Sequence, residues 1–338
     1  MNVLYNTMRN LYRNEEKIPM RYLSEKDLVE IGPDWEQLIR VVETAIKCLK
    51  ANDYSQPIKP YLRYRDKRNR IIAMPAFVGG EVDSCGIKWV SSFPKNLDFN
   101  LPRAHSVLIL NRSNTGEPKA IINTPLLSIL RTVAISGYFI EKYIKSRKTH
   151  GLKIGIIGFG PIGQKHLSFL QDMYFDHIEQ IFIYDIRDVL INAISTDKVE
   201  LVNTWQEAYL QSDIVITCTV SEQPYINLPP MAGSMLLNVS LRDYCTNIFE
   251  DLRAGIVVDD WNEVCRENTD IERMHIEKNL QEHEVHTIVD VFKENGFDFI
   301  SNNSPIMINP MGMSVFDISV GEYFYNKAEN LCTGKVLE

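Results

Sequence analysis

The sequence predicts an α/β protein: a Rossmann-type, doubly wound parallel sheet joined to an α+β part whose sheet is mostly antiparallel. Two observations support this prediction. The stretch KIGIIGFGPIGQKHL at 153–167 places a glycine-rich turn between a strand and a helix, and alternating strands and helices follow it. The 338 residues exceed what one hydrophobic core normally serves, so the half before the turn should form a unit of its own.

The first half combines an amphipathic helix with several short strands. From Asp34, the stretch DWEQLIRVVETAIKCLKAND carries apolar side chains at helical spacing, and Asp34 is a suitable N-terminal cap. Five strand-like runs follow, separated by Asn, Gly and Asp turns: KPYLRY, RIIAMPAFV, GIKWVSSF, SVLILN and KAIINT. A long helix over Pro125–Ser146 then leads into the glycine turn.

From Lys153 the pattern becomes strand–helix alternation, which is typical of a parallel sheet with crossover helices. KIGII is the first buried strand, PIGQKHLSFLQDMY a helix and IFIYD the next strand. Further apolar strands are predicted within 214–220, 234–240 and 255–261. A last helix over Ser314–Leu331 is apolar enough to pack on the first half or on a second subunit.

Composition and charge exclude several classes of protein. The chain is 45% hydrophobic and 24% charged, with a net charge of −8 and no block rich in Lys or Arg, which disfavours nucleic acids and anionic membranes as partners. No apolar run approaches the roughly 20 residues of a membrane span. The first 17 residues lack the apolar centre of a secretory signal and are interpreted as a disordered lead or an extra helix.

The cysteines indicate a reducing compartment. All six lie far apart and form no CxxC pair, so we expect free thiols in a cytoplasmic protein. We also expect no metal site. His283 and His286 are three residues apart on a predicted helix without a third ligand nearby in the sequence, and a solvated helix face explains them better.

The glycine turn is interpreted as a pyrophosphate site. Gly158, Gly160 and Gly163 form G-x-G-x-x-G after a strand and at the start of a helix. A tight backbone turn there brings N–H groups close to a phosphate at the helix N-terminus. Pro161 and Ile162 complete the turn and are expected to contact the cofactor.

Asp185 indicates that the cofactor is NAD. It ends IFIYD, where a carboxylate accepts hydrogen bonds from the adenosine ribose and repels the 2′-phosphate of NADP. Arg187 would favour NADP, but Asp185 holds the expected position. Thr217 and Thr219 lie at the carboxyl end of a later strand and are expected near the cofactor, with Cys218 as a small packed residue.

A hydride-transferring enzyme must hold its substrate, and substrate carboxylates need Arg or Lys partners. The first half offers five such cations: Lys59, Arg63, Lys88, Arg103 and Arg131. Lys88 and Arg131 lie in otherwise apolar runs, where an unpaired charge is costly, so each is expected to face an anionic partner or ligand. For Lys59, Arg63 and Arg103, a structural ion pair explains the charge equally well.

The order of these motifs resembles the ornithine cyclodeaminase/mu-crystallin family. QPIK, AMPA, GIKWV, FPKN, TGEP and LLSILRTVAIS precede the glycine turn, and the similarity covers the chain from about Arg21. The resemblance implies a substrate-binding and dimerisation domain made of residues 1–130 and 312–338. It implies an NAD-binding Rossmann domain of residues 131–311, the helix 125–146 as connector, and a homodimer.

The resemblance also assigns roles to individual residues. Lys88 matches the family's lysine associated with substrate and chemistry, and Asp243, in NVSLRDY, matches its acid/base aspartate. Arg131 matches an arginine near cofactor and substrate, and Asp317 an aspartate that lines the substrate site. Met311, in NPMGMSVFDIS, is expected beside the cofactor.

Lys59 departs from the family pattern. Much of the family has an arginine there that binds the substrate carboxylate, and a lysine offers a point charge instead of a bidentate fork. Arg63 or Arg103 would then share the carboxylate.

The strings QPIKPYLRY, CTVSEQPYI and VVDDW are similar to one branch, the N-(2-amino-2-carboxyethyl)-L-glutamate dehydrogenases of 2,3-diaminopropionate biosynthesis. The resemblance implies NAD-dependent oxidation of a secondary amine followed by hydrolysis. The products are L-2,3-diaminopropionate, 2-oxoglutarate and NADH. Three alternatives stay open: a cyclodeaminating lyase, an imine or ketimine reductase, and a small-molecule carrier like mu-crystallin. Siderophore and antibiotic pathways are both open for the product.

Overall fold

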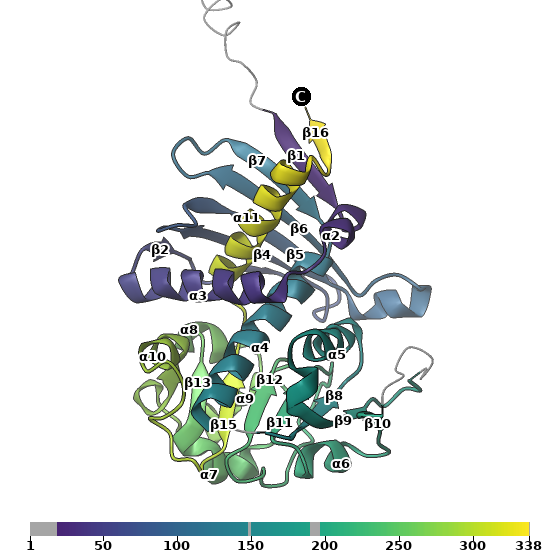
Figure 1. The fold of residues 1–338 in the computed structure, drawn as a ribbon, viewed down its shortest axis with the longest axis vertical. Helices are drawn as coiled ribbons and strands as arrows, with labels where there is room; N and C mark the ends of the chain where they lie inside the picture. The colour runs from purple at the N-terminus through teal and green to yellow at the C-terminus, as the bar shows by residue number, and fades with distance from the viewer. Residues whose placement is uncertain (1–18, 148–149, 190–196, 338) are drawn as a thin grey trace, which may run out of the picture.

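The computed structural model describes residues 19–147, 150–189 and 197–337, and two stacked sheets dominate it (Figure 1). The expectation for the first 17 residues lies outside the described residues. In the first sheet the strand order is β16-β1-β7-β6-β5-β4-β2, with β3 paired to β4. Its strands are β1 (Met20–Ser24), β2 (Tyr54–Ser55), β3 (Tyr61–Leu62), β4 (Arg70–Val78), β5 (Ser84–Ser92), β6 (Ala104–Arg112), β7 (Pro118–Asn123) and β16 (Lys335–Leu337).

The second sheet is parallel throughout, in the order β10-β9-β8-β11-β12-β15-β13-β14. Because β9 lies on one side of β8 and β11 on the other, the sheet is doubly wound about β8. Its strands are β8 (Leu152–Ile157), β9 (Ile178–Tyr184), β10 (Val199–Leu201), β11 (Ile214–Thr217), β12 (Met235–Asn238), β13 (Ile256–Val258), β14 (His286–Thr287) and β15 (Ile306–Asn309). The predicted fold class is therefore confirmed. Within the first sheet, the pairing of β1 with β7 is the exception, because these two strands run parallel.

Helices cover one face of the first sheet and both faces of the second (Figure 1). They are α2 (Glu25–Ile31), α3 (Trp35–Ala51), α4 (Leu126–Arg147), α5 (Pro161–Tyr174), α6 (Trp205–Leu210), α7 (Phe249–Leu252), α8 (Trp261–Val264), α9 (Asp270–Lys278), α10 (Ile288–Lys293) and α11 (Ser314–Leu331). The 3₁₀ segments include η1 (Pro94–Phe99) and η6 (Glu282–Glu284). The three long helices predicted near 34–51, 125–146 and 314–331 are all present.

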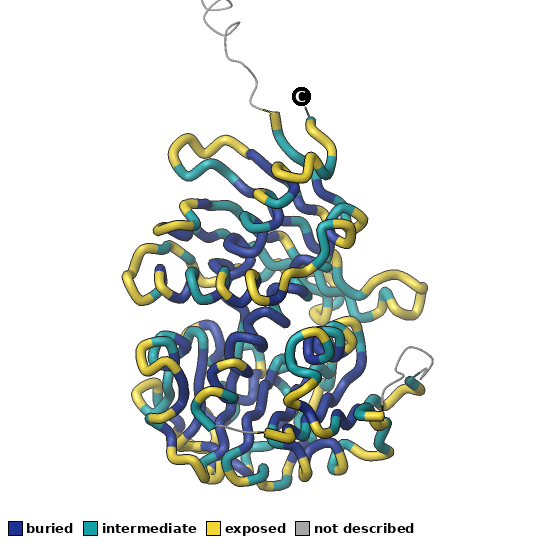
Figure 2. The backbone as a smooth tube through the Cα atoms, in the orientation of Figure 1, coloured by how far each residue is buried: buried dark blue, intermediate teal, exposed yellow. Residues whose placement is uncertain are grey.

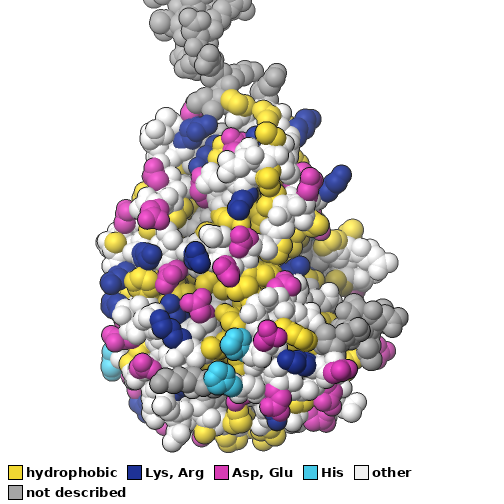
Figure 3. Space-filling view, in the orientation of Figure 1, with side chains coloured by type: hydrophobic (Ala, Val, Ile, Leu, Met, Phe, Trp, Pro, Cys, Tyr) yellow, Lys and Arg dark blue, Asp and Glu magenta, His cyan; other side chains and the backbone are white. Residues whose placement is uncertain are grey.

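Two hydrophobic cores hold the layers together. The larger core joins α3, α4 and α11, the inner face of the first sheet and one face of the parallel sheet. The smaller core covers the other face of the parallel sheet. Figure 2 shows the central parallel strands as largely buried, whereas β10 at the edge is not. Figure 3 shows acidic and basic side chains mixed on the surface in view. The two layers are packed against each other through contacts of α4 with α5 and of α3 with α10.

Two sequence interpretations differ from the structure. The prediction that His283 and His286 share a helix is wrong: His283 lies in the single turn η6, and His286 begins strand β14. Strand β15 was not predicted, because its four residues follow a polar loop and insert between β12 and β13, out of chain order.

Candidate active site

The glycine turn joins β8 to α5 where the strand order reverses. Gly158 has a φ of +94°, and a Cβ there would lie 2.8 Å from the backbone carbonyl of Cys218. A Cβ on Gly163 would lie 2.2 Å from the Gly158 oxygen, whereas a Cβ on Gly160 would meet no atom nearer than 4.0 Å. Packing therefore explains the first and third glycines. The second leaves open space before the N-terminus of α5, as a pyrophosphate requires.

Asp185 follows β9 and ties the second strand to this turn. Its Oδ2 accepts the Phe159 N–H at 2.7 Å, and its Oδ1 accepts the Arg187 N–H at 2.9 Å and the Arg187 Nε–H at 3.1 Å. Burial acts to raise the pKa of Asp185, but the hydrogen bonds from Arg187 and Phe159 outweigh burial and lower the pKa. The end of β9 thus presents a charged carboxylate beside the open end of α5, and this pair of features fits NAD.

Other expected cofactor residues lie along the same edge of the sheet. Pro161 is the first residue of α5, and the Ile162 carbonyl lies 2.9 Å from Nδ1 of His166. Burial lowers the pKa of His166 to about 4, so this ring is neutral. The Cys218 Sγ lies 3.8 Å from the same ring nitrogen, and burial raises the pKa of its thiol. Thr217 is fully buried at the end of β11.

Asp243 lies in the loop after β12 and is fully buried. Its carboxylate accepts hydrogen bonds from the hydroxyls of Thr219 and Ser240. Burial raises the pKa of Asp243, although these hydrogen bonds oppose the shift. Asp270, whose pKa burial raises to about 7, accepts the backbone N–H of Asp243 at 3.1 Å. Two buried carboxyl groups side by side favour a bound proton near neutral pH.

Lys88, Arg131 and Asp317 form one buried cluster. The Lys88 Nζ lies 2.7 Å from Oδ1 of Asp317, and the Arg131 Nε–H donates to the same oxygen at 3.0 Å. Burial lowers the pKa of Lys88 to about 8, against the raising effect of Asp317. Burial acts to raise the pKa of Asp317, but the two cations outweigh it and lower that pKa. Lys88 can therefore exchange a proton near neutral pH while Asp317 stays charged.

Lys88 and Asp243 belong to separate hydrogen-bonded groups. Lys88 projects from β5 of the first sheet and pairs with Asp317, whereas Asp243 follows β12 of the second sheet and bonds to hydroxyls. The acid and the base suggested by the sequence therefore come from different layers.

Lys59 is buried where the two layers meet. Its Nζ–H₃ donates to the carbonyls of Gly312 at 3.0 Å and Met311 at 3.4 Å, and lies 3.6 Å from Oε2 of Glu263. Burial lowers the pKa of Lys59, against the raising effect of Glu263. Met311 is held in turn by its N–H, which donates to Oδ1 of Asp259 at 3.1 Å.

Arg63 and Arg103 have different surroundings. The Arg63 guanidinium pairs with Glu267 and lies 5.0 Å from the ring centroid of Tyr61. The Arg103 side chain has no hydrogen-bond or ion-pair partner among the residues that the structure describes. Burial lowers the pKa of Arg103, and the positive charge of the nearby Arg70 lowers it further. Arg63 is thus already neutralised, whereas Arg103 is not.

Several polar residues of this region were missed by sequence reasoning: Arg70, Arg242, Asp259, Glu263 and Asp270. The position of Arg242 directly before Asp243 was a usable signal. Nothing in the sequence marks the others, because their contacts cross between distant segments. Within the described ranges, no group of three or more His, Cys, Asp or Glu side chains is placed to hold a metal ion.

The doubly wound sheet, its glycine turn and the lysine–arginine–aspartate cluster define a two-layer protein with a Rossmann-type dinucleotide fold. The chain belongs to the ornithine cyclodeaminase/mu-crystallin family, which matches residues 22–331. It is 33% identical over 344 aligned positions to N-((2S)-2-amino-2-carboxyethyl)-L-glutamate dehydrogenase of Staphylococcus aureus. The alignment covers 94% of this chain and 98% of that protein.

Solved structures share the fold. The Δ1-pyrroline-2-carboxylate reductase of Thermococcus litoralis, in complex with NADH and L-proline, superposes with a TM-score of 0.80 at 21% identity and covers 94% of this chain and 99% of its own. An archaeal alanine dehydrogenase dimer with bound NAD gives a TM-score of 0.79 at 21% identity and covers 95% and 99% of the two chains.

Proposed function

We propose that this protein is an NAD-dependent dehydrogenase. Its reaction converts N-(2-amino-2-carboxyethyl)-L-glutamate, NAD⁺ and water into L-2,3-diaminopropionate, 2-oxoglutarate, NADH and a proton. The observation that supports it most strongly is the 33% identity, over 94% of the chain, to an enzyme named for this substrate. The buried cluster of Lys88, Arg131 and Asp317 agrees with it, because a substrate with several carboxylates needs cations.

The glycine turn and Asp185 would hold the cofactor. The N–H groups at the start of α5 would bind the pyrophosphate in the space before Gly160, and Asp185 would accept the ribose hydroxyls. Arg131, Thr217, Thr219 and Met311 remain proposed contacts of its nicotinamide half. NAD supplies the acceptor for the hydride that leaves the glutamate Cα.

Lys88 and Asp243 would move the protons. With a pKa near 8, Lys88 can take the proton of the substrate nitrogen, which leaves a C=N bond once the hydride has gone. Water then adds to that carbon, and Asp243, whose pKa burial raises, would protonate the departing nitrogen as the carbinolamine collapses. Arg131 and Lys59, with Arg63 or Arg103, would bind the carboxylates, and Asp317 would hold Lys88 and Arg131 in place.

Product analysis tests the proposed reaction. Purified protein with the conjugate and NAD⁺ should yield 2-oxoglutarate and diaminopropionate in equal amounts, measured by mass spectrometry. L-Ornithine serves as the alternative substrate. Proline and ammonia from ornithine, with no 2-oxoglutarate from the conjugate, would contradict the proposal and favour a lyase.

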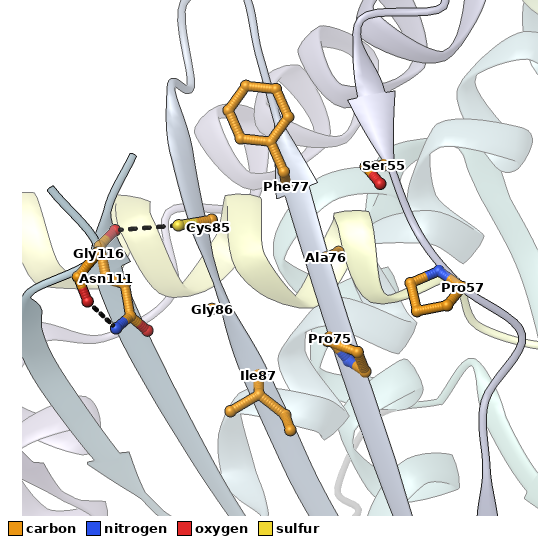
Figure 4. A pocket seen from close by; sticks show the side chains of 10 residues that line it. All are labelled: Ser55, Pro57, Pro75, Ala76, Phe77, Cys85, Gly86, Ile87, Asn111 and Gly116. Atoms are coloured by element: carbon orange, nitrogen blue, oxygen red, sulfur yellow. Dashed lines mark hydrogen bonds between the residues drawn. The ribbon is translucent and has the colours of Figure 1, made fainter. Parts of the chain in front are cut away.

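We propose a homodimer formed through the outer face of the first sheet. Pro75, Ile87 and Ile109 lie opposite one another on β4, β5 and β6, and Trp89 on the same face is 45% exposed. Figure 4 shows this face, opposite α11, with a cavity of about 440 Å³. An antiparallel sheet with apolar side chains on an uncovered face calls for a partner surface, and the alanine dehydrogenase of similar fold is named as a dimer.

The domain division and compartment follow from the same proposal. We propose that residues 1–130 and 312–338 bind substrate and the partner subunit, and that residues 131–311 bind NAD. None of the described helices has the length and apolar character to cross a membrane. The six cysteines are unpaired, which supports the cytoplasm as the working compartment.

A further inference from the structure

Three arginines from distant parts of the chain come together at one end of the candidate site. Arg70 begins β4, Arg103 precedes β6, and Arg242 lies in the loop after β12. We call Arg70, Arg103 and Arg242 the arginine cluster. Burial lowers the pKa of both Arg103 and Arg242, and the positive charge of Arg70 lowers both pKa values further. Arg70 lies opposite Ser92, which lies opposite Ala104, so Arg70 and Arg103 are two strands apart at one end of the first sheet. Arg242 donates to the carbonyl of Glu267, whose carboxylate pairs with Arg63, and the Arg63 and Arg70 guanidinium groups lie 5.0 and 5.9 Å from the ring centroid of Tyr61. The repulsion that lowers the pKa of Arg103 agrees with this placement.

The cluster has no carboxylate partner among the described residues. Arg242 donates to backbone carbonyls, those of Glu267 at 2.9 Å and 3.2 Å and of Ser240 at 3.4 Å. The Nε–H of Arg70 is buried and finds no acceptor in the described part of the chain. Arg103 likewise makes no side-chain hydrogen bond or ion pair there. Partly buried like charges without a counter-ion are costly, so this arrangement calls for an anionic ligand.

Neighbouring arginines are paired, which sets the cluster apart. Arg63 pairs with Glu267, and Nη2 of Arg266 lies 3.0 Å from Oε2 of Glu263. Acidic side chains are therefore present nearby but bind other arginines. In a chain with a net charge of −8, a group of three arginines without an ion pair among the described residues is a local exception, although Asp270 and Glu267 act to raise the pKa of Arg242.

The register of the first sheet places the cluster in reach of the reacting groups. Met74 of β4 lies directly opposite Lys88 of β5, so both side chains share one face of the sheet. Arg70 is four residues before Met74 on that strand, hence on the same face and about 13 Å away along it. Arg242 directly precedes Asp243 on the facing loop. The cluster thus combines an arginine on the Lys88 face of the first sheet with the arginine next to Asp243.

We propose that the arginine cluster binds the substrate carboxylates that lie farthest from the oxidised C–N bond. Guanidinium groups bind carboxylates through paired hydrogen bonds, and three of them select a ligand with more than one carboxylate. The same charges repel a ligand whose far end carries an ammonium group and no carboxylate, as in ornithine. This inference rests on the proposed function and narrows its substrate class to amino-acid conjugates with several carboxylates.

Binding without turnover tests the cluster separately from the reaction. Propane-1,2,3-tricarboxylate is titrated into the full chain by calorimetry, with butanoate as the single-carboxylate comparison. The wild type should bind the tricarboxylate, and Arg70→Gln and Arg103→Gln should each weaken its binding about ten- to a hundredfold, the effect of one lost charge-assisted hydrogen bond. Arg103→Lys should fall in between, because it keeps the charge and loses the fork.

Arg68→Gln is the matched control. Arg68 lies two residues before Arg70, is 53% exposed and is paired with Asp66 at 2.7 Å, so its loss should leave tricarboxylate binding unchanged. Tricarboxylate binding that is absent in the wild type, or equally tight in Arg70→Gln and Arg103→Gln, would overturn the inference. If the binding pattern holds but the conjugate gives no NADH, the proposed reaction fails and the anion site stands.

Discussion

Asp317 is the residue on which the buried cluster depends, and Asp317→Asn tests this directly. The substitution keeps the shape of the side chain and removes the charge that lies 2.7 Å from Lys88 and 3.0 Å from Arg131. Removing one partner of a buried ion pair costs about 3–5 kcal/mol, so we expect the free energy of unfolding at pH 7 to fall by that amount. Urea denaturation followed by circular dichroism measures it.

The size of this loss should depend on pH in a defined direction. Asp317 raises the pKa of Lys88, so in Asp317→Asn that pKa falls below about 8. At a pH between the Lys88 pKa of the folded variant and that of the folded wild type, Lys88 is protonated in the folded wild type and neutral in the folded variant. In the unfolded variant Lys88 is protonated, so unfolding of the variant takes up a proton. The variant therefore gains stability as pH rises toward 8, by about 1.4 kcal/mol per unit, and the difference from wild type shrinks. Above about pH 8 the difference stays constant.

A surface ion pair on the same helix provides the control. Glu329 of α11 pairs with Arg21 and is 46% exposed, so Glu329→Gln should cost less than about 1 kcal/mol. A loss of similar size for Asp317→Asn at pH 7, or a loss that grows from pH 7 to pH 8, would refute the account of the buried cluster.

Four further outcomes follow from the structure. Asp185→Ser removes the carboxylate at the end of β9, and we expect the preference for NAD over NADP, measured as a ratio of kcat/KM, to fall about tenfold or more. The pH profile of wild-type kcat/KM should rise through about pH 8 as Lys88 becomes neutral and can accept a proton, and a flat profile there would contradict its role as base. Gly160→Val should weaken NAD binding, measured by fluorescence titration, with little change in melting temperature, whereas Gly163→Val should lower the melting temperature because its side chain overlaps the backbone. Ile109→Lys should convert the dimer to a monomer in analytical ultracentrifugation, and an unchanged mass would exclude this face as the interface.

The features that sequence predicted best are those set by local pattern. The turn around Gly158 depends on a positive φ and on its spacing to Gly163, and both are visible in the glycines themselves. The helix over Ser314–Leu331 could be predicted, with its length, from the apolar residues along it. The burial of Lys88 followed from the apolar run around it, since a charge in such a strand has few ways to reach water.

Contacts between the two layers were not predictable from local pattern. The Lys59 N–H donates at 2.8 Å to Glu263, 204 residues later, and nothing in VVDDWNEV marks that glutamate. Arg70 begins a strand after a turn, where a charged residue is unremarkable. The sequence could supply the separate groups of the site, but not which carboxylate neutralises which cation, because that depends on how the sheets pack.

The most direct test of the central proposal is the rate of NADH formation from N-(2-amino-2-carboxyethyl)-L-glutamate in the wild type, Lys88→Ala and Asp243→Asn, followed at 340 nm. We expect steady NADH formation by the wild type. Because general acid–base catalysis contributes about 10²–10⁴-fold, we expect kcat to fall at least a hundredfold in each folded variant. Near-normal kcat in both variants, or no NADH from the wild type, would contradict the proposal.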